Sequence, residues 1–223
     1  MPDAVMLFAA GFGTRMGALT KDRPKPLIEV AGRPLLDHAL DLTRGLSTRV
    51  VNAHYHADQI LGHLQGRDVT VSVETPEILD TGGGLRHALP LLGDAPVFTL
   101  NTDAIWNGPN PLDLLQAAWD PGKMDALLLC VPIAQAVGRN APGDFTLHPS
   151  GRLIRQGDLV YTGAQIVKTD LLHDMTQPAF SLNLLWNRMA QDDRLNGLTY
   201  PGKWCDVGHP DGIALAEGVL RDG

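Results

Sequence analysis

Short apolar runs alternate with amphipathic stretches through the first half of the chain. Residues 4–9 and 125–131 are almost entirely apolar, which is typical of strands buried on both faces of a parallel sheet. Leucines recur at helical spacing over residues 35–46, so this stretch predicts a helix that packs one face on the sheet. We expect further strands at 48–53, 69–73 and 96–101, and further helices at 58–64, 85–92 and 111–119. This alternation predicts an α/β fold with a doubly wound parallel sheet.

The regular alternation of predicted strands and helices ends after Val131. Residues 138–160 are rich in Gly, Pro and polar residues, with short strands expected at 144–147 and 153–154. A strand at 161–167, a helix at 182–190, a short strand or turn at 204–208 and a helix at 210–220 follow. No repeat or long linker divides the chain, so we predict a single domain over residues 1–223. Its second part, about 132–223, is expected to be a substrate-side extension of the first, about 1–131.

Composition limits the possible partners. The chain has 223 residues, of which 44% are hydrophobic and 19% are charged, as in an ordinary globular protein. Its formal net charge is −7, which argues against non-specific binding of nucleic acid because such binding depends on a basic surface. A small anionic ligand remains possible, since a local cationic pocket can exist on an acidic protein.

The cysteines and the apolar runs predict a location in the cytoplasm. There are two cysteines, Cys130 and Cys205, which form no disulfide framework and suit a reducing compartment. Cys130 lies in an apolar run and is expected in the core. The start of the chain lacks the basic segment of a secretory signal, and no apolar run reaches the length of about 18 residues that a membrane span needs.

The first loop carries the clearest chemical signal. Small residues and glycines follow the first strand directly, so backbone N–H groups could approach a ligand closely. Arg15 and Lys25 bring positive charge to the same region. A glycine-rich loop at the carboxyl end of a strand, with cations beside it, predicts phosphate binding. We expect this loop to hold the triphosphate of a nucleotide.

Two commoner phosphate-binding motifs do not match this loop. A P-loop requires a Gly-Lys-Ser/Thr sequence after its first glycine, and neither Gly11 nor Gly17 is placed before such a pair. A dinucleotide-binding fingerprint requires a third glycine where Met16 stands and an acidic residue at the end of the second strand, which here ends near Asn52.

Other short motifs accompany the loop along the chain. They are Gly11-x-Gly13-Thr14-Arg15-Met16, Pro24-Lys25-Pro26, Gly32-Arg33-Pro34-Leu35, Asp80-Thr81-Gly82-Gly83-Gly84, Asn101-Thr102-Asp103 and Trp204-Cys205-Asp206-Val207-Gly208. In this combination the chain resembles the sugar-nucleotidyltransferase family, also called nucleotide-sugar pyrophosphorylases, over essentially its whole length. The resemblance implies a Rossmann-like, mostly parallel core that transfers a nucleoside monophosphate to a sugar 1-phosphate and releases pyrophosphate.

The resemblance also assigns the phosphate chemistry to named residues. Arg15 and Lys25 would be catalytic, because two anionic reactants must be neutralised and aligned. Asp103 and Asp206 would together hold Mg²⁺, which suits hard oxygen ligands. On its residue type alone, Asp103 could also be a turn or N-cap aspartate. The nucleotide would contact Ala9, Ala10, Gly11, Gly13, Thr14, Arg15, Asn52, Asp80, Thr81, Gly82 and Gly83. Asn52 is a weaker candidate than the others, and Glu74 is a further weak candidate.

The glycine motif and the sugar end leave alternatives open. Asp80-Thr81-Gly82-Gly83-Gly84 could be the start of the helix at 85–92, with Thr81 as its cap and the glycines as loop. In the resemblance it lies against the base and ribose, with Gly83 allowing close approach. The sugar phosphate is expected near Asp144, Tyr161 and Gly163, although Asp144 could as well be a surface turn residue.

Among family members, compact N-acetylmuramate-1-phosphate uridylyltransferases resemble the chain most, which predicts UTP as the nucleotide. Mannose-1-phosphate guanylyltransferases, which use GTP, share nearly all of these motifs. A hypothesis from another class is a catalytically inactive homologue that senses nucleotide as a regulatory subunit. The lack of a C-terminal extension favours a monomer without excluding a small homo-oligomer.

Overall fold

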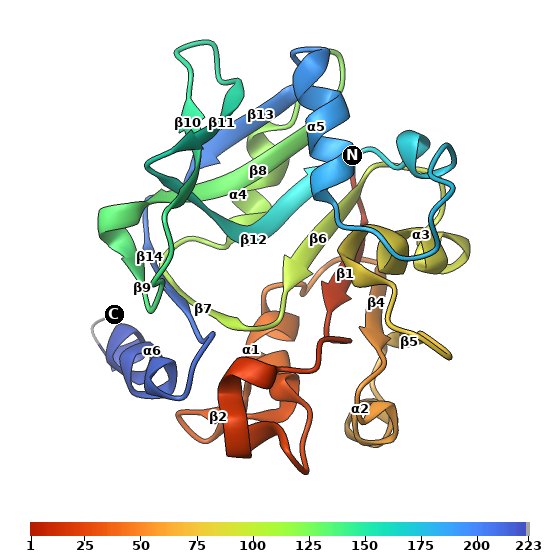
Figure 1. The fold of residues 1–223 in the computed structure, drawn as a ribbon, viewed down its shortest axis with the longest axis vertical. Helices are drawn as coiled ribbons and strands as arrows, with labels where there is room; N and C mark the ends of the chain where they lie inside the picture. Colours follow the sequence, from red (N-terminus) through yellow and green to blue (C-terminus); the bar gives the residue numbers. More distant parts are fainter. Residues whose placement is uncertain (222–223) are drawn as a thin grey trace.

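A nine-stranded sheet forms the centre of the molecule in the computed structural model, which describes residues 1–221 (Figure 1). Its main strand order is β11-β10-β12-β6-β1-β4-β5, and β8 and β13 join through β12. The four strands at one end are parallel: β6 pairs with β1, β1 with β4, and β4 with β5. These strands are β1 (Ala4–Phe8), β4 (Thr48–Ala53), β5 (Thr70–Val73) and β6 (Val97–Asn101).

The second half of the chain completes the same sheet. The long strand β12 (Leu159–Val167) runs antiparallel to β6, to β8 (Ala126–Pro132) and to β10 (Gly143–Leu147). β11 (Leu153–Gly157) pairs antiparallel with β10, whereas β13 (Leu195–Thr199) pairs parallel with β8. The predicted α/β fold with a parallel-dominant sheet in a single domain is therefore confirmed, and strands from both halves of the chain share one sheet.

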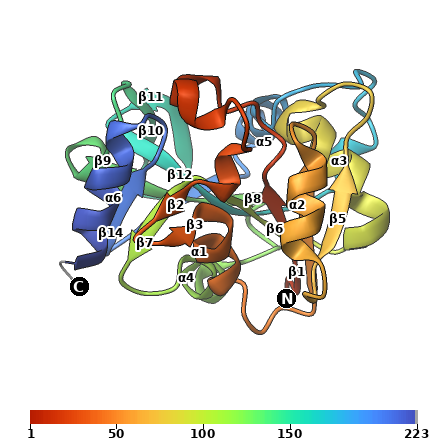
Figure 2. The same cartoon turned by 90° about the horizontal axis from the view of Figure 1, so that it is seen from below.

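Helices cover both faces of this sheet (Figure 2). α1 (Leu35–Asp41), α2 (Ala57–Leu64) and α4 (Pro111–Ala118) pack on one face; α3 (Asp80–Leu92) and α5 (Asn183–Gln191) pack on the other. Strand β1 supplies both cores, because Val5 and Leu7 face the first set of helices and Ala4 and Met6 face the second. This explains why its sequence is a continuous apolar run.

A small second sheet lies beside the main one. β7 (Ala104–Asn107) pairs antiparallel with β14 (Lys203–Asp206), which also pairs with β9 (Ala136–Val137). α6 (Asp211–Arg221) packs on this sheet around a third core cluster that includes Met16 and Ile105. The remaining elements are the hairpin β2 (Glu29–Val30) and β3 (Arg33–Pro34), and the 3₁₀ helices η1 (Thr14–Thr20), η2 (Lys25–Leu27), η3 (Ile133–Gln135) and η4 (Asp170–Leu172).

Three local expectations need correction. The helix expected at 35–46 ends at Asp41, and turns follow it. The helix expected at 85–92 begins at Asp80, so the three glycines lie within α3 and not in a loop before it. Strands β7 and β13 were not expected at all. β13 contains Gly197, which weakens the strand pattern. A Cβ there would lie 2.4 Å from Leu153 Cδ2, so the glycine leaves room for the side chain of the residue that opens β11.

Both cysteines are buried and free, and Cys130 lies in the core as expected. Burial raises the pKa of both thiols, that of Cys205 to about 12, so neither is a ready nucleophile. Across residues 1–221, no helix has both the length and the apolar character needed to cross a membrane.

Candidate active site

A cavity of about 300 Å³ opens at the carboxyl ends of the parallel strands. In a sheet of this kind ligands bind at this edge. The cavity brings together most residues that the sequence singled out: Ala9, Ala10, Gly11, Gly13, Thr14, Arg15, Lys25, Asn52, Asp80, Thr81 and Asp103. Other lining residues are Pro26, Asn101, Thr102 and Gly208, which belong to the sequence motifs but were not predicted as contacts, together with Phe8 and Ile78.

The first loop depends on one glycine for its shape. Gly13 has a φ of 63°, a left-handed conformation that glycine adopts without strain. A Cβ at this position would lie 2.9 Å from both Lys25 Cβ and Thr20 Cγ2. The hydroxyl of Thr20 donates to the carbonyl oxygen of Gly13 at 3.1 Å and fixes the loop from inside. Gly13 therefore allows the loop to pack directly on Lys25.

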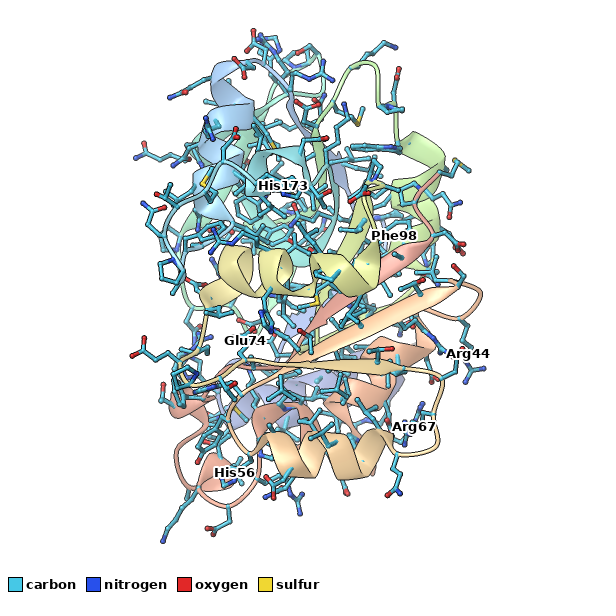
Figure 3. All side chains as sticks on the ribbon, turned by 90° about the vertical axis from the view of Figure 1, so that its right-hand side faces the viewer. Arg44, His56, Arg67, Glu74, Phe98 and His173 are labelled. Atoms are coloured by element: carbon cyan, nitrogen blue, oxygen red, sulfur yellow. The ribbon has the colours of Figure 1, made fainter. Side chains whose placement is uncertain are left out.

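A buried polar network ties this loop to the neighbouring strands. The backbone N–H of Ala9 donates to Asn52 Oδ1 at 2.7 Å, and Asn52 Nδ2 donates to Glu74 Oε1 at 2.7 Å. The other Glu74 oxygen accepts from the N–H of Leu79 at 2.7 Å. Glu74 follows β5 and lies beside α3 (Figure 3). Asn52 and Glu74 line the cavity. Because their side chains hydrogen-bond with other parts of the protein, their first role is to stabilise the cavity wall.

Lys25 and Asp103 form a partly buried ion pair at the base of the cavity. Lys25 Nζ lies 2.7 Å from Asp103 Oδ2, and the Lys25 side chain is 10% exposed. Pro24 has an extended backbone and Pro26 lies in the first turn of η2, so the prolines flanking Lys25 restrict its backbone. An ammonium group has three donors, and the contact with Asp103 leaves others for a ligand.

Asp103 and Asp206 are brought together by the small sheet. Ala104, directly after Asp103, is the register partner of Asp206 in the pairing of β7 with β14. The N–H of Val207 donates to the carbonyl oxygen of Asp103 at 2.8 Å, which fixes the two chain segments at this point. The sequence predicted this pair only through family resemblance, because it gave no sign of β7.

Arg15 joins the two carboxylates near Gly208. A Cβ at Gly208 would lie 3.1 Å from Asp206 Oδ2 and 3.3 Å from Arg15 Nη1, so both side chains approach the same glycine. Burial raises the pKa of Asp206, and the nearby Asp103 carboxylate raises it further, while Lys25, Arg15 and Arg139 act in the opposite direction. A cation placed between the two carboxylates would favour their ionised forms.

The carboxylates of the site could provide only part of the ligands of a metal ion. Within residues 1–221, no group of three or more His, Cys, Asp or Glu side chains is arranged to hold a metal ion. Asp103 lines the cavity, whereas Asp206 lies next to it, against the lining residue Gly208. Mg²⁺ is often bound by one or two carboxylates together with water and substrate phosphate. The two aspartates fit such a site, in which the substrate and water supply the remaining ligands.

The glycines of α3 serve packing inside the protein. The N–H groups of Gly82 and Gly83 both donate to the carbonyl oxygen of Phe180, at 2.8 and 3.0 Å. A Cβ at Gly82 would lie 2.4 Å from the Phe180 ring, and one at Gly84 would lie 2.5 Å from Glu74 Oε1. Asp80 and Thr81 line the cavity, but Gly82 and Gly83 lie behind them. Thr81 does not cap the helix, since its hydroxyl oxygen accepts from the N–H of Leu182.

A second cavity of about 270 Å³ adjoins the first. The two share Phe8, Asp80, Thr81 and Asn101 as lining residues. Asp144 and Tyr161, both expected near the sugar phosphate, lie here. Asp144 accepts from the N–H of Tyr161 at 2.9 Å and from Arg139 at 3.1 Å, so Asp144 is part of a cavity wall and not an isolated surface turn.

The third expected sugar-phosphate residue, Gly163, lines neither cavity. It has a φ of 89°, and a Cβ there would lie 2.6 Å from Asn101 Cβ. The register of β12 against β8 shifts between Tyr161 and Gln165. Gly163 therefore permits an irregularity in β12 where this strand passes Asn101, a residue that lines both cavities.

The sequence assigned no role to several residues of the second cavity, among them Arg139, Arg155 and Trp186. Arg139 lies five positions before Asp144 in a polar loop, a spacing that could have suggested a charged pair. Arg155 and Trp186 come from β11 and α5, which meet only in the folded chain, so no local pattern links them.

Comparisons with known proteins agree with this geometry. A family model described as MobA-like NTP transferase domain matches residues 5–151. The N-acetylmuramate alpha-1-phosphate uridylyltransferase of Caulobacter vibrioides is 41% identical over 99% of this chain and 98% of its own length. The protein of the same name from Neisseria meningitidis serogroup B is 31% identical, with 91% and 92% covered. The crystal structure of HddC from Yersinia pseudotuberculosis complexed with GMP-PN has the same fold, with a TM-score of 0.79 at 20% identity over 97% of this chain and 99% of that one.

Proposed function

The chain belongs to the MobA-like NTP transferase family and is a nucleotidyltransferase of the sugar-1-phosphate type, and we propose that it transfers UMP from UTP to N-acetylmuramate 1-phosphate. The products are pyrophosphate and a nucleotide-sugar, and Mg²⁺ is the cofactor. The choice of base and sugar rests on two relatives that are each more than 30% identical over more than 90% of this chain, and both carry the same name.

One observation carries the proposed reaction. Two cations and two carboxylates from three distant parts of the sequence meet around the first cavity: Arg15 and Lys25, Asp103, and Asp206. A protein that only bound a nucleotide would have no need of the carboxylate pair, because carboxylates repel phosphates. Paired carboxylates beside a phosphate site are useful when a divalent cation joins the two.

The chemistry is an in-line displacement at the α-phosphorus of UTP. An oxygen of the sugar phosphate forms a new bond to this phosphorus as the bond to the oxygen bridging the α- and β-phosphorus breaks, and pyrophosphate leaves with that oxygen. Both reactants are anionic, so catalysis consists mainly of alignment and charge neutralisation. Bound Mg²⁺ supplies positive charge at the phosphates.

Each side chain of the site has a role that follows from its position. Arg15 follows the glycine-rich loop, and its planar guanidinium can bind two oxygens of the β- and γ-phosphates at once. Lys25 is held at Asp103 and acts as a point charge at the α-phosphate. Asn52 and Glu74 keep the backbone of Ala9 fixed, so the cradle needs little reorganisation when the triphosphate binds.

The two adjoining cavities suit two substrates that react with each other. The nucleotide occupies the first and the sugar the second, with the reacting phosphates at the shared boundary near Asn101. In the second cavity, Asp144 can accept hydrogen bonds from sugar hydroxyl groups.

A matrix of nucleoside triphosphates and sugar 1-phosphates tests this proposal. Pyrophosphate release is measured with Mg²⁺ for UTP, GTP, CTP and ATP against the 1-phosphates of N-acetylmuramate, N-acetylglucosamine, glucose and mannose. We expect the highest kcat/KM for UTP with N-acetylmuramate 1-phosphate. A maximum for GTP with mannose 1-phosphate would identify a guanylyltransferase, and nucleotide binding without any turnover would support a regulatory subunit.

A further inference from the structure

The second cavity contains two guanidinium groups that lie against different neighbours. Arg139 follows Gly138, which packs so closely on the backbone of Asp206 that a Cβ there would lie 2.3 Å from the Asp206 carbonyl oxygen. Arg139 thus lies on the side of the carboxylate pair, where the reacting phosphates meet. Arg155 comes from β11 and lies against α5 instead.

Arg155 lies in the wall of the cavity and contacts two aromatic rings and α5. Its guanidinium lies over the ring of Phe145, 4.9 Å from the centroid, and over that of Trp186 at 5.5 Å. Nη2 donates to Asn187 Oδ1 at 2.8 Å, and Nε donates to the same oxygen at 3.1 Å. Nη1 makes no hydrogen bond within residues 1–221.

No carboxylate of the described chain forms an ion pair with Arg155, in contrast to Arg139, which pairs with Asp144. The Asp144 carboxylate acts on Arg155 from across the cavity and raises the pKa of the guanidinium, but burial lowers this pKa by more. A partly buried cation with no carboxylate in direct contact is costly. A neutral side chain of similar length could pack on Phe145 and Trp186 without that cost. The charge at this position is therefore better explained by an anion that arrives with a ligand.

We propose that Arg155 binds a carboxylate carried by the sugar and thereby selects an acidic sugar 1-phosphate over a neutral one. The inference rests on the proposed function, since N-acetylmuramate bears such a carboxylate on its lactyl ether. Its 1-phosphate lies toward Asp206 and Arg139, so the carboxylate is left for the cation beside α5. A guanidinium offers two parallel donors to a carboxylate and is the suitable group for this recognition.

A comparison of two substrates with four proteins tests this selection. The substrates are N-acetylmuramate 1-phosphate and its lactyl methyl ester, which differ in one negative charge. The proteins are the wild type, Arg155→Met, Arg155→Lys and a matched control, Arg152→Met. Arg152 lies just before the same strand but pairs with Asp193 and does not line the second cavity. Circular dichroism and thermal melting establish that each variant folds.

The readout is the ratio of kcat/KM for the acid to kcat/KM for the ester. We expect the wild type and Arg152→Met to prefer the acid by about ten- to a hundredfold, as a charged hydrogen-bonded pair would give. In Arg155→Met the ratio should fall close to one. Arg155→Lys, which keeps the charge but not the paired donors, should give an intermediate ratio.

Failure of this inference differs from failure of the proposed function. If the wild type uses N-acetylmuramate 1-phosphate but Arg155→Met keeps the wild-type ratio, Arg155 only packs α5 on β11 and the inference is wrong. If Arg155→Met does not fold, an unchanged ratio in folded Arg155→Lys overturns the inference equally. If neither muramate compound is turned over while another sugar 1-phosphate is, the proposed sugar is wrong and the selection falls with it.

Discussion

The ammonium group of Lys25 lies 2.7 Å from Oδ2 of Asp103, a residue 78 positions further along the chain. This pair links the loop region after β1 to the segment between β6 and β7. It places the cation proposed to meet the α-phosphate beside a carboxylate proposed to bind the metal. The first prediction tests Lys25, and the second tests Asp206, the carboxylate that the pairing of β7 with β14 brings to Asp103.

Replacing Lys25 with alanine should lower turnover without unfolding the protein. The substitution removes the positive charge from the phosphate site, and we expect kcat to fall by about a hundredfold. Lys21→Ala, an exposed lysine of the same region, should keep wild-type kcat. Steady-state kinetics with a melting curve provide the comparison, and a Lys25→Ala protein that is unfolded would indicate a structural role for the ion pair.

Asp206→Asn should remove most of the metal-dependent activity while preserving the size of the side chain. With one carboxylate left we expect a loss of about a hundredfold or more in kcat, and weaker binding of Mg²⁺ in a calorimetric titration in the presence of nucleotide. The matched control is Asp158→Asn, an exposed aspartate far from the carboxylate pair in sequence. Near-normal Mg²⁺-dependent turnover by Asp206→Asn would exclude it as a metal ligand.

Gly13→Ala should destabilise the fold, because the residue has a positive φ and its Cβ would contact Lys25 and Thr20 at 2.9 Å. We expect the free energy of unfolding to fall by about 1–3 kcal/mol. Gly11→Ala is the control within the same loop, since no atom lies within 4 Å of its added Cβ. Denaturant titration of both variants measures the free energy of unfolding. Equal stability of the two variants would mean that the loop tolerates a side chain at Gly13.

Glu74→Gln should weaken the polar network behind the nucleotide cavity. Both carboxylate oxygens of Glu74 accept hydrogen bonds, and the glutamine amide nitrogen would face a donor instead. The expected loss in the free energy of unfolding is about 1–3 kcal/mol, together with a raised KM for UTP. Glu77→Gln, on the exposed side of the same connection, should change neither quantity.

The parallel part of the fold and the first loop could be predicted because their signals are local. The apolar run of β1 is buried on both faces, so its sequence alone indicates a strand in a covered sheet. The glycines and cations of the first loop are close in sequence and close in space. The helix of residues 57–64 and the strand of residues 48–53 follow equally local patterns.

The remaining features depend on contacts between distant segments. Asp103 meets Asp206 only because the short strands β7 and β14 pair, and nothing in the sequence around either aspartate indicates that pairing. Gly82 and Gly83 suggested an approach to the nucleotide, whereas their N–H groups bind Phe180, about a hundred residues later. Arg155 lies against Phe145 and Trp186, which belong to other elements, so its position in the cavity could not be predicted from the residues around it in the sequence.

The fate of the α-phosphorus of UTP tests the central claim most directly. The wild-type protein is incubated with Mg²⁺, N-acetylmuramate 1-phosphate and UTP that is radiolabelled at the α-phosphorus, and the products are separated by chromatography. The transfer mechanism predicts that the label appears in the nucleotide-sugar, in equal amount to the pyrophosphate released. Label in free UMP would indicate hydrolysis, and label that stays in UTP would indicate binding without transfer; either result would contradict the proposed reaction.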